Sequence, residues 1–248
     1  MPYRRLPNTD KARLRAIHTA LKKESIVPVN ELAFSFPTLE RLQFLRPKYE
    51  AALQQLQASR KNQFNKSKEY GQSFRRAKLY ISHFIQVLTF AIIREEIKPE
   101  VRPLYGLSPD DHRIPPLNLE KEVLHWGEKI IEGEHMRNIQ GGSPIYSPSI
   151  ALVKVHYESF VDAYHHQKML QSITTRASQA MLGLRDEADL LIPQVWNEIE
   201  EHYTGLPDRI KRQKAAEYGV CYVYRSSELK KIEAEKLQHH LSFDQGRL

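Results

Sequence analysis

Apolar residues at helical spacing run through this chain in long stretches with few helix breakers, and this pattern limits the fold more than any other feature. One stretch passes through Leu14, Ile17 and Leu21, and another through Val153, Tyr157 and beyond. Of 248 residues, only 10 are glycine and 14 are proline, a composition that disfavours a turn-rich sandwich or barrel. The sequence therefore predicts an all-α fold, a bundle of amphipathic helices.

Prolines and N-cap residues divide this pattern into separate helices. Thr9 and Asp10 are good N-cap residues, and Pro37 and Pro148 are tolerated in a first helical turn. The polar stretch 60–72 either extends the 37–56 helix or forms the turn after it, and Gly71 is the expected break. Five prolines make residues 98–118 irregular. The predicted helices are 10–25, 37–56, 74–97, the linker helix 119–136, 148–182, 186–203, 207–219 and a C-terminal helix 226–240.

A shift of 111 residues aligns two parts of the chain without a gap. It places Pro37 on Pro148, and Tyr49 on Phe160. The agreement is in the positions of apolar residues and helix starts, which amphipathic helices can also imitate. We predict two pseudo-repeated helical hairpins, residues 37–107 and 148–220, packed as a four-helix core in a single domain over residues 1–248.

Residues 218–225 are the one segment dense in β-branched and aromatic side chains, which favours a short strand. This segment contains Cys221, the only cysteine. One cysteine excludes an internal disulfide and any site built from several thiolates, and it fits a reducing compartment. Between Val220 and Tyr222, Cys221 is expected to be a small buried apolar residue.

Nothing in the sequence predicts contact with a membrane. The basic start of the chain leads into the charged stretch 11–15 where a secretory signal would be apolar. The most apolar stretch, residues 79–93, contains Ser82, His83, Gln86 and Thr89 and is shorter than a membrane span. We therefore expect a buried core helix at 79–93 and a cytoplasmic protein.

Positive charge is concentrated in the N-terminal third. Residues 1–76 contain 16 Lys and Arg against 6 Asp and Glu, a net charge of +10, whereas the whole chain carries +7. Such a surface can attract nucleic acid, and Tyr70 and Phe74 could stack on bases, although core packing is the more ordinary role for both. The alternative is a basic surface that meets acidic residues of the same molecule or of a partner. The candidate nucleic-acid residues are Arg4, Arg5, Arg13, Arg15, Lys22, Lys23, Arg60, Lys61, Arg75 and Arg76.

Two Glu-x-x-His pairs suggest a metal site, because di-iron bundles use this spacing on facing helices. Glu122 with His125 and Glu132 with His135 both fall on the 119–136 helix, ten residues apart, so they cannot face each other in one chain. Solvated or capping roles are the alternative. The chain has no zincin, serine-hydrolase or P-loop motif, so an enzyme is disfavoured and no cofactor is expected.

Five stretches resemble a family of uncharacterised bacterial all-helical proteins. They are the start of the chain at 1–17, Trp126 to Glu134, Gly141 to Ile150, Asp186 to Ile192 and Tyr218 to Tyr224. The resemblance extends over most of the chain and implies a shared helical architecture. It implies no activity, ligand or catalytic residue.

These patterns favour a non-enzymatic interaction or assembly module, in which helix surfaces and the basic N-terminal region contact another protein or a second copy of the chain. Two alternatives remain from the sequence. One is weak, sequence-independent nucleic-acid binding through the basic third. The other is a metal-binding or enzymatic role of the 119–136 helix.

Overall fold

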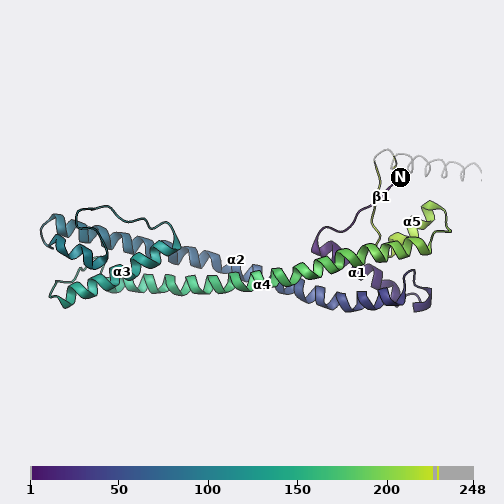
Figure 1. The fold of residues 1–248 in the computed structure, drawn as a ribbon, viewed down its shortest axis with the longest axis horizontal. Coiled ribbons are helices and arrows are strands. Elements are labelled where there is room, and N and C mark those ends of the chain that lie inside the picture. The colour runs from purple at the N-terminus through teal and green to yellow at the C-terminus, as the bar shows by residue number, and fades with distance from the viewer. Residues whose placement is uncertain (1, 226–227, 229–248) are drawn as a thin grey trace, which may run out of the picture. The chain divides into compact units, whose positions relative to one another are not determined.

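The computed structural model describes residues 2–225 and residue 228, and its secondary structure is mainly helical, with one pair of short strands and connecting loops. In Figure 1 the colour follows the chain, from α1 in purple to α5 in yellow-green. The all-α prediction with a short β segment is confirmed. The predicted helix 226–240 lies outside the described residues, apart from residue 228. The elements are β1 (Tyr3–Arg4), α1 (Asp10–Lys22), α2 (Phe36–Ile93), α3 (Glu120–Ile139), α4 (Ile150–His202), α5 (Asp208–Glu217) and β2 (Tyr222–Val223), with 3-10 turns at Lys23–Ser25, Val29–Glu31 and Pro99–Tyr105.

The predicted break inside each hairpin is wrong, because α2 and α4 are continuous helices. α2 continues through Pro47 and Gly71, and α4 continues through Gly183 and Pro193. A proline inside a helix leaves one carbonyl without its amide partner. At Pro47 the helix surface is exposed, so water can solvate that carbonyl, while Tyr49 on the opposite side is fully buried. Packing of the buried face therefore outweighs the local cost of the breaker.

The chain divides into two compact units, each built from one part of α2 and one part of α4. Unit 1 contains residues 2–57, 177–225 and 228 among those described, and unit 2 is Ala58–Arg176. Segments far apart in sequence therefore form each core. The two arms that the sequence predicts for each hairpin are parts of one continuous helix instead.

Unit 1 packs α1 against the first part of α2 and the last part of α4 (Figure 1). Thr9 caps α1 as predicted, its Oγ1 accepting the backbone N–H of Ala12 at 3.2 Å. The two strands pair antiparallel, with Tyr3 opposite Val223. The core includes Ile17, Leu21, Leu42, Leu45, Tyr49, Leu191, Val195 and Trp196.

Unit 2 packs α3 and the Pro99–Tyr105 turn against α2 and α4 (Figure 1). The irregular segment is held by a fully buried arginine, Arg102, whose Nε donates to the carbonyl of Ser108 at 2.7 Å and whose Nη1 donates to Thr89 on α2 at 3.0 Å. The core includes Ile81, Phe84, Leu88, Tyr105, Val123, Ile130, Val153 and Phe160.

The helix expected to be a central core element at 79–93 buries only one side. Leu79, Phe90 and Ile93 are 61, 55 and 58% exposed, so the expectation of a fully buried helix is wrong. Among the described residues, no helix is both long enough and apolar enough to cross a bilayer.

Burial follows the 111-residue shift. Five apolar pairs of the shift are buried in both long helices, and Leu79 and its counterpart Leu190 are both exposed. Duplication of the two parts stays a prediction, since any two helices with one buried side can share such a pattern. The buried pairs are Leu42 with Val153, Tyr49 with Phe160, Ala77 with Ala188, Ile81 with Ile192 and Phe84 with Val195.

Candidate anion-binding site

A pocket of about 560 Å³ opens on unit 1 beside the first turn of α1. Its walls come from residues 5–9, one side of α1, Trp196 of α4 and the segment 219–221. The backbone N–H of Arg5 donates to the carbonyl of Cys221 at 2.9 Å, and Thr9 caps α1. The wall formed by residues 5–9 is therefore fixed at both of its ends.

Two arginines line this pocket, and no ion pair neutralises the charge of either one among the described residues. Arg5 and Arg15 are exposed, and neither guanidinium has an acidic partner among the described residues. Of the residues that the structure describes, no Asp or Glu lines the pocket. Two positive charges in a concave site attract an anion more strongly than they would on a flat surface, since the protein wall limits solvent screening.

The rest of the lining is neutral. Leu6 and Ala12 supply apolar surface, and Thr19 of α1 and the largely buried Trp196 complete the lining. Gly219 has φ of 95°, and a Cβ at this position would lie 3.0 Å from Cβ of Thr19. A glycine here lets the 219–221 segment approach α1 closely and close the pocket on that side.

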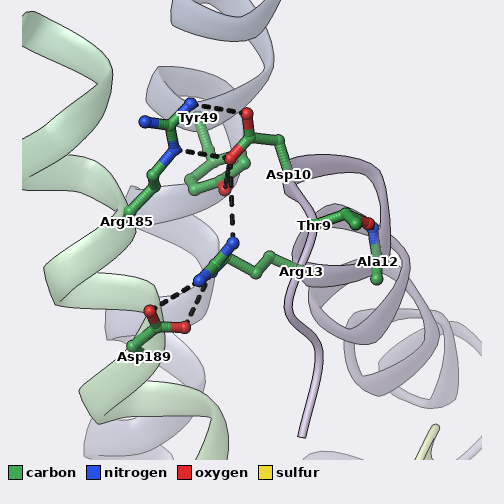
Figure 2. A network of polar contacts seen from close by, with 7 residues as sticks. All are labelled: Thr9, Asp10, Ala12, Arg13, Tyr49, Arg185 and Asp189. Carbon is green, nitrogen blue, oxygen red and sulfur yellow. Dashed lines mark hydrogen bonds and ion pairs between the residues drawn. The ribbon is translucent and has the colours of Figure 1, made fainter.

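A network of two bidentate ion pairs fixes α1 next to the pocket (Figure 2). Arg185 donates from Nε and Nη2 to the two oxygens of Asp10, at 2.7 and 2.8 Å. Arg13 donates to both oxygens of Asp189, each at 2.7 Å. Tyr49 donates its hydroxyl hydrogen to Asp10 at 3.2 Å. Both long helices thus hold the start of α1.

The electrostatics of this network follow from the same contacts. Hydrogen bonds from Arg185 lower the pKa of Asp10 below its ordinary value, although partial burial opposes them. Burial, together with the Asp10 carboxylate, raises the pKa of Tyr49. The hydrogen bonds to Asp189 raise the pKa of Arg13. Asp10 and Arg13 therefore stay charged and Tyr49 stays neutral at neutral pH.

Three of the six N-terminal basic candidates are used inside unit 1. Arg13 belongs to the network above. Arg4 donates to Asn197 at 2.7 Å and lies 3.5 Å from Glu200, and Lys23 lies 2.7 Å from Glu217. Arg5 and Arg15 line the pocket, and Lys22 is exposed on α1.

The other four basic candidates lie on α2 in unit 2. Arg60, Lys61, Arg75 and Arg76 are exposed and remote in sequence from the N-terminal group. The aromatic residues that were candidates for stacking lie elsewhere: the rings of Tyr70 and Phe74 have centroids 6.2 and 5.5 Å from that of Phe160. They are core residues. The exposed aromatic residue among these cations is Phe64, with 78% of its surface accessible.

The structure does not bring the proposed metal ligands together. Glu122 caps α3 by accepting the backbone N–H groups of Asn118 and Leu119, both at 2.8 Å, and Glu132 pairs with Lys129 at 3.0 Å. His125 and His135 are exposed on α3. Among the described residues, no group of three or more His, Cys, Asp and Glu could hold a metal ion.

Sequence reasoning missed most of the pocket. Cys221 is exposed and lines it, so the expectation of a buried cysteine is wrong. Trp196 is 98% buried and belongs to the core of unit 1. Nothing in the sequence distinguishes it from other core residues. A signal for Phe64 was present, because it lies three residues after Lys61 and four before Lys68 on one side of an uninterrupted helix.

In comparisons with known proteins, no family model, no curated protein and no solved structure matches the chain.

Proposed function

We propose that this protein is a non-enzymatic interaction module whose unit 1 pocket binds an acidic segment of a partner protein. The observation that carries the proposal is the pair Arg5 and Arg15, which line a concave site and have no acidic partner in the part of the chain that the structure describes. Neighbouring cations such as Arg13 and Lys23 are neutralised by ion pairs. A site that keeps two positive charges unpaired can stabilise a bound carboxylate through charge-assisted hydrogen bonds.

The lining supports a peptide as the ligand. Leu6 is half exposed at the pocket, and Ala12 and Pro7 add apolar surface beside the arginines. A peptide with a carboxylate side chain next to an apolar side chain fits this lining. Its carboxylate would pair with the arginines, and its apolar side chain would cover the apolar surface of the pocket. A nucleic-acid backbone presents a row of phosphates, and a single pocket with two cations would meet only one or two of them.

The proposed setting of this module is the cytoplasm, because a chain with a single cysteine fits a reducing compartment. We also propose that the chain is related to the uncharacterised bacterial helical proteins that its sequence resembles. The metal or enzyme alternative for α3 has less support, because Glu122 and Glu132 already have structural partners.

Binding of a fluorescein-labelled acidic peptide, alternating Glu and Leu, tests the proposal by fluorescence anisotropy. We expect Arg15→Gln to weaken binding about tenfold, the effect of removing one charge-assisted contact, and Arg5→Gln with Arg15→Gln to abolish it. The matched control is Arg209→Gln, an exposed arginine of α5 in the same unit that lies outside the pocket. It should bind like the wild type.

Two results would contradict the proposal. One is equal binding by the wild type and the double variant, which would remove the pocket from the interaction. The other is an equal loss in Arg209→Gln, which would mean that net charge alone attracts the peptide. Circular dichroism of each variant checks the fold, which substitution of these exposed arginines should not change.

A further inference from the structure

The outer side of α2 in unit 2 carries a regular row of polar and aromatic residues, here called the α2 outer face. Lys61, Phe64, Lys68, Gln72 and Arg75 occupy positions i, i+3, i+7, i+11 and i+14 of one uninterrupted helix. Such positions lie on one side of a helix. Each of these side chains is exposed, so the whole row faces solvent.

The row lies opposite the core. Tyr70 and Phe74 pack against Phe160 of α4, and Ala77 is fully buried. These residues are on the other side of the same helical turns. The α2 outer face therefore makes no contribution to the hydrophobic core of unit 2, and its charges are free to serve another purpose.

Positive charge on this segment is nearly uncompensated. Residues 58–78 include seven Lys and Arg but one acidic residue, Glu69. Glu69 pairs with Lys66, at 2.9 Å, and Lys66 is outside the row. Lys61, Lys68 and Arg75 have no acidic partner among the described residues, and they recur every seven residues, about 10.5 Å apart along the helix axis.

An exposed aromatic ring lies within this row. Phe64 is 78% accessible and lies between Lys61 and Lys68. A large apolar ring in water is unfavourable for the free protein. Cationic side chains that follow a phosphate backbone, combined with an aromatic ring on which a base can stack, are the recurring elements of single-strand binding surfaces.

We propose that the α2 outer face binds single-stranded nucleic acid without sequence preference, with Lys61, Lys68 and Arg75 contacting phosphates and Phe64 stacking on a base. A second copy of the same face is a poor occupant, since the row contains no acidic residue and like charges would repel. A duplex is also disfavoured, because its bases are already stacked and unavailable to Phe64. This inference is independent of the unit 1 pocket.

Anisotropy of a labelled oligothymidylate of about 20 nucleotides tests the inference on the full-length protein at about 50 and 200 mM salt. We expect the wild type to bind and to lose affinity steeply with salt. The triple variant Lys61→Gln, Lys68→Gln, Arg75→Gln should bind at least tenfold more weakly. Its slope of log affinity against log salt should fall by about 2, near 0.7 for each lost phosphate contact.

Substitutions of Phe64 separate the contribution of base stacking from the contribution of charge. Phe64→Leu keeps an apolar side chain but removes the ring, and we expect affinity to fall about 5- to 100-fold with an unchanged salt slope. Phe64→Trp should bind as well as the wild type or better. Equal binding by Phe64→Leu would overturn the stacking role.

The matched control for charge is Lys98→Gln, Arg113→Gln, Lys121→Gln, which removes three exposed cations from unit 2 outside the row. It should bind like the wild type. An equal loss in both triple variants would overturn the assignment of the site. No binding of oligothymidylate at the lower salt, or binding only to phosphatidylserine vesicles, would overturn the ligand class. The Arg5 and Arg15 variants should keep full affinity here, so a failure of the pocket proposal remains distinguishable.

Discussion

Arg137 forms a bidentate ion pair with Glu134 one helical turn before it in α3, with Nη2 and Nε lying 2.7 and 2.9 Å from the two carboxylate oxygens. Solvent hardly reaches either side chain, which are 4 and 0% exposed. Tyr105 donates its hydroxyl hydrogen to the same carboxylate and accepts a hydrogen bond from Nε of Arg137 at 2.8 Å. Arg137 also donates to the carbonyl of Ser143 at 2.7 Å, so the pair fixes the loop after α3.

This pair predicts an asymmetric response to substitution. Glu134→Gln leaves the guanidinium of Arg137 buried without its counter-charge and should destabilise unit 2 by about 3–5 kcal/mol. Glu134→Leu with Arg137→Met removes both charges and should cost clearly less. A double variant as unstable as Glu134→Gln would show that packing, and not the lost charge, dominates.

The two tryptophans make such measurements specific. Trp126 is in unit 2 and Trp196 in unit 1, and the chain contains no other tryptophan. Urea unfolding followed by fluorescence in a Trp196→Phe background therefore reports on unit 2, and a Trp126→Phe background reports on unit 1. Each substitution is compared with the same background.

Asp10 and Arg185 predict a pH-dependent contribution in unit 1. Because hydrogen bonds from Arg185 lower the pKa of Asp10 below 3.8, the stabilisation is fully present above that value and is lost as pH falls through the folded-state pKa. Asp10→Asn should cost about 1–3 kcal/mol at neutral pH. Its stability should approach that of the wild type in acid, measured by Trp196 fluorescence. A difference in unfolding free energy between the wild type and Asp10→Asn that stays constant into strong acid would exclude this linkage.

Two glycines on helices should respond in opposite directions to alanine. A Cβ on Gly133 would lie 2.5 Å from Cδ1 of Tyr105 and 2.8 Å from the carbonyl oxygen of Leu104, so Gly133→Ala should destabilise unit 2 by about 1–3 kcal/mol. Gly183 in α4 has open space around it. Gly183→Ala should stabilise unit 1 by up to about 1 kcal/mol, because alanine has the higher helix propensity. Thermal melts of both variants check the two signs.

Glu122 should behave as a helix cap and not as a metal ligand. Its carboxylate accepts two backbone N–H groups before α3, and Glu122→Ala should cost about 0.5–2 kcal/mol in unit 2. His125→Ala, at an exposed position, should leave stability unchanged. A chelator should affect none of the variants. A loss of wild-type stability on adding EDTA, matched by His125→Ala, would restore the metal hypothesis.

Much of the secondary structure was predictable from local chemistry. Thr9 begins α1, Pro207 precedes α5, and residues 218–225 contain the short strand that pairs with β1. Each of these signals acts within a few residues, where backbone hydrogen bonding and side-chain shape decide the outcome. The basic N-terminal third was equally visible, as a count of charges.

The helix breaks predicted at glycine residues are wrong where packing in the protein core outweighs the low helix propensity of glycine. Gly71 and Gly183 are intrinsic interruptions, each worth about 1 kcal/mol against a helix. The buried positions on either side of each glycine, such as Ala77 and Ala188, are fixed by contacts with distant segments. Those contacts exceed the local preference, so α2 and α4 continue and the predicted hairpins do not form.

The sequence by itself determined that this protein is helical, where most helices begin and which third is basic, because these properties depend on neighbouring residues. Only the tertiary structure decided which cations remain unpaired. Arg13 meets Asp189 and Lys23 meets Glu217 across gaps of 176 and 194 residues, whereas Arg5, Arg15 and Lys61 meet no acidic partner among the described residues. Ion pairing acts over a few ångströms in space, and sequence distance does not reveal that separation.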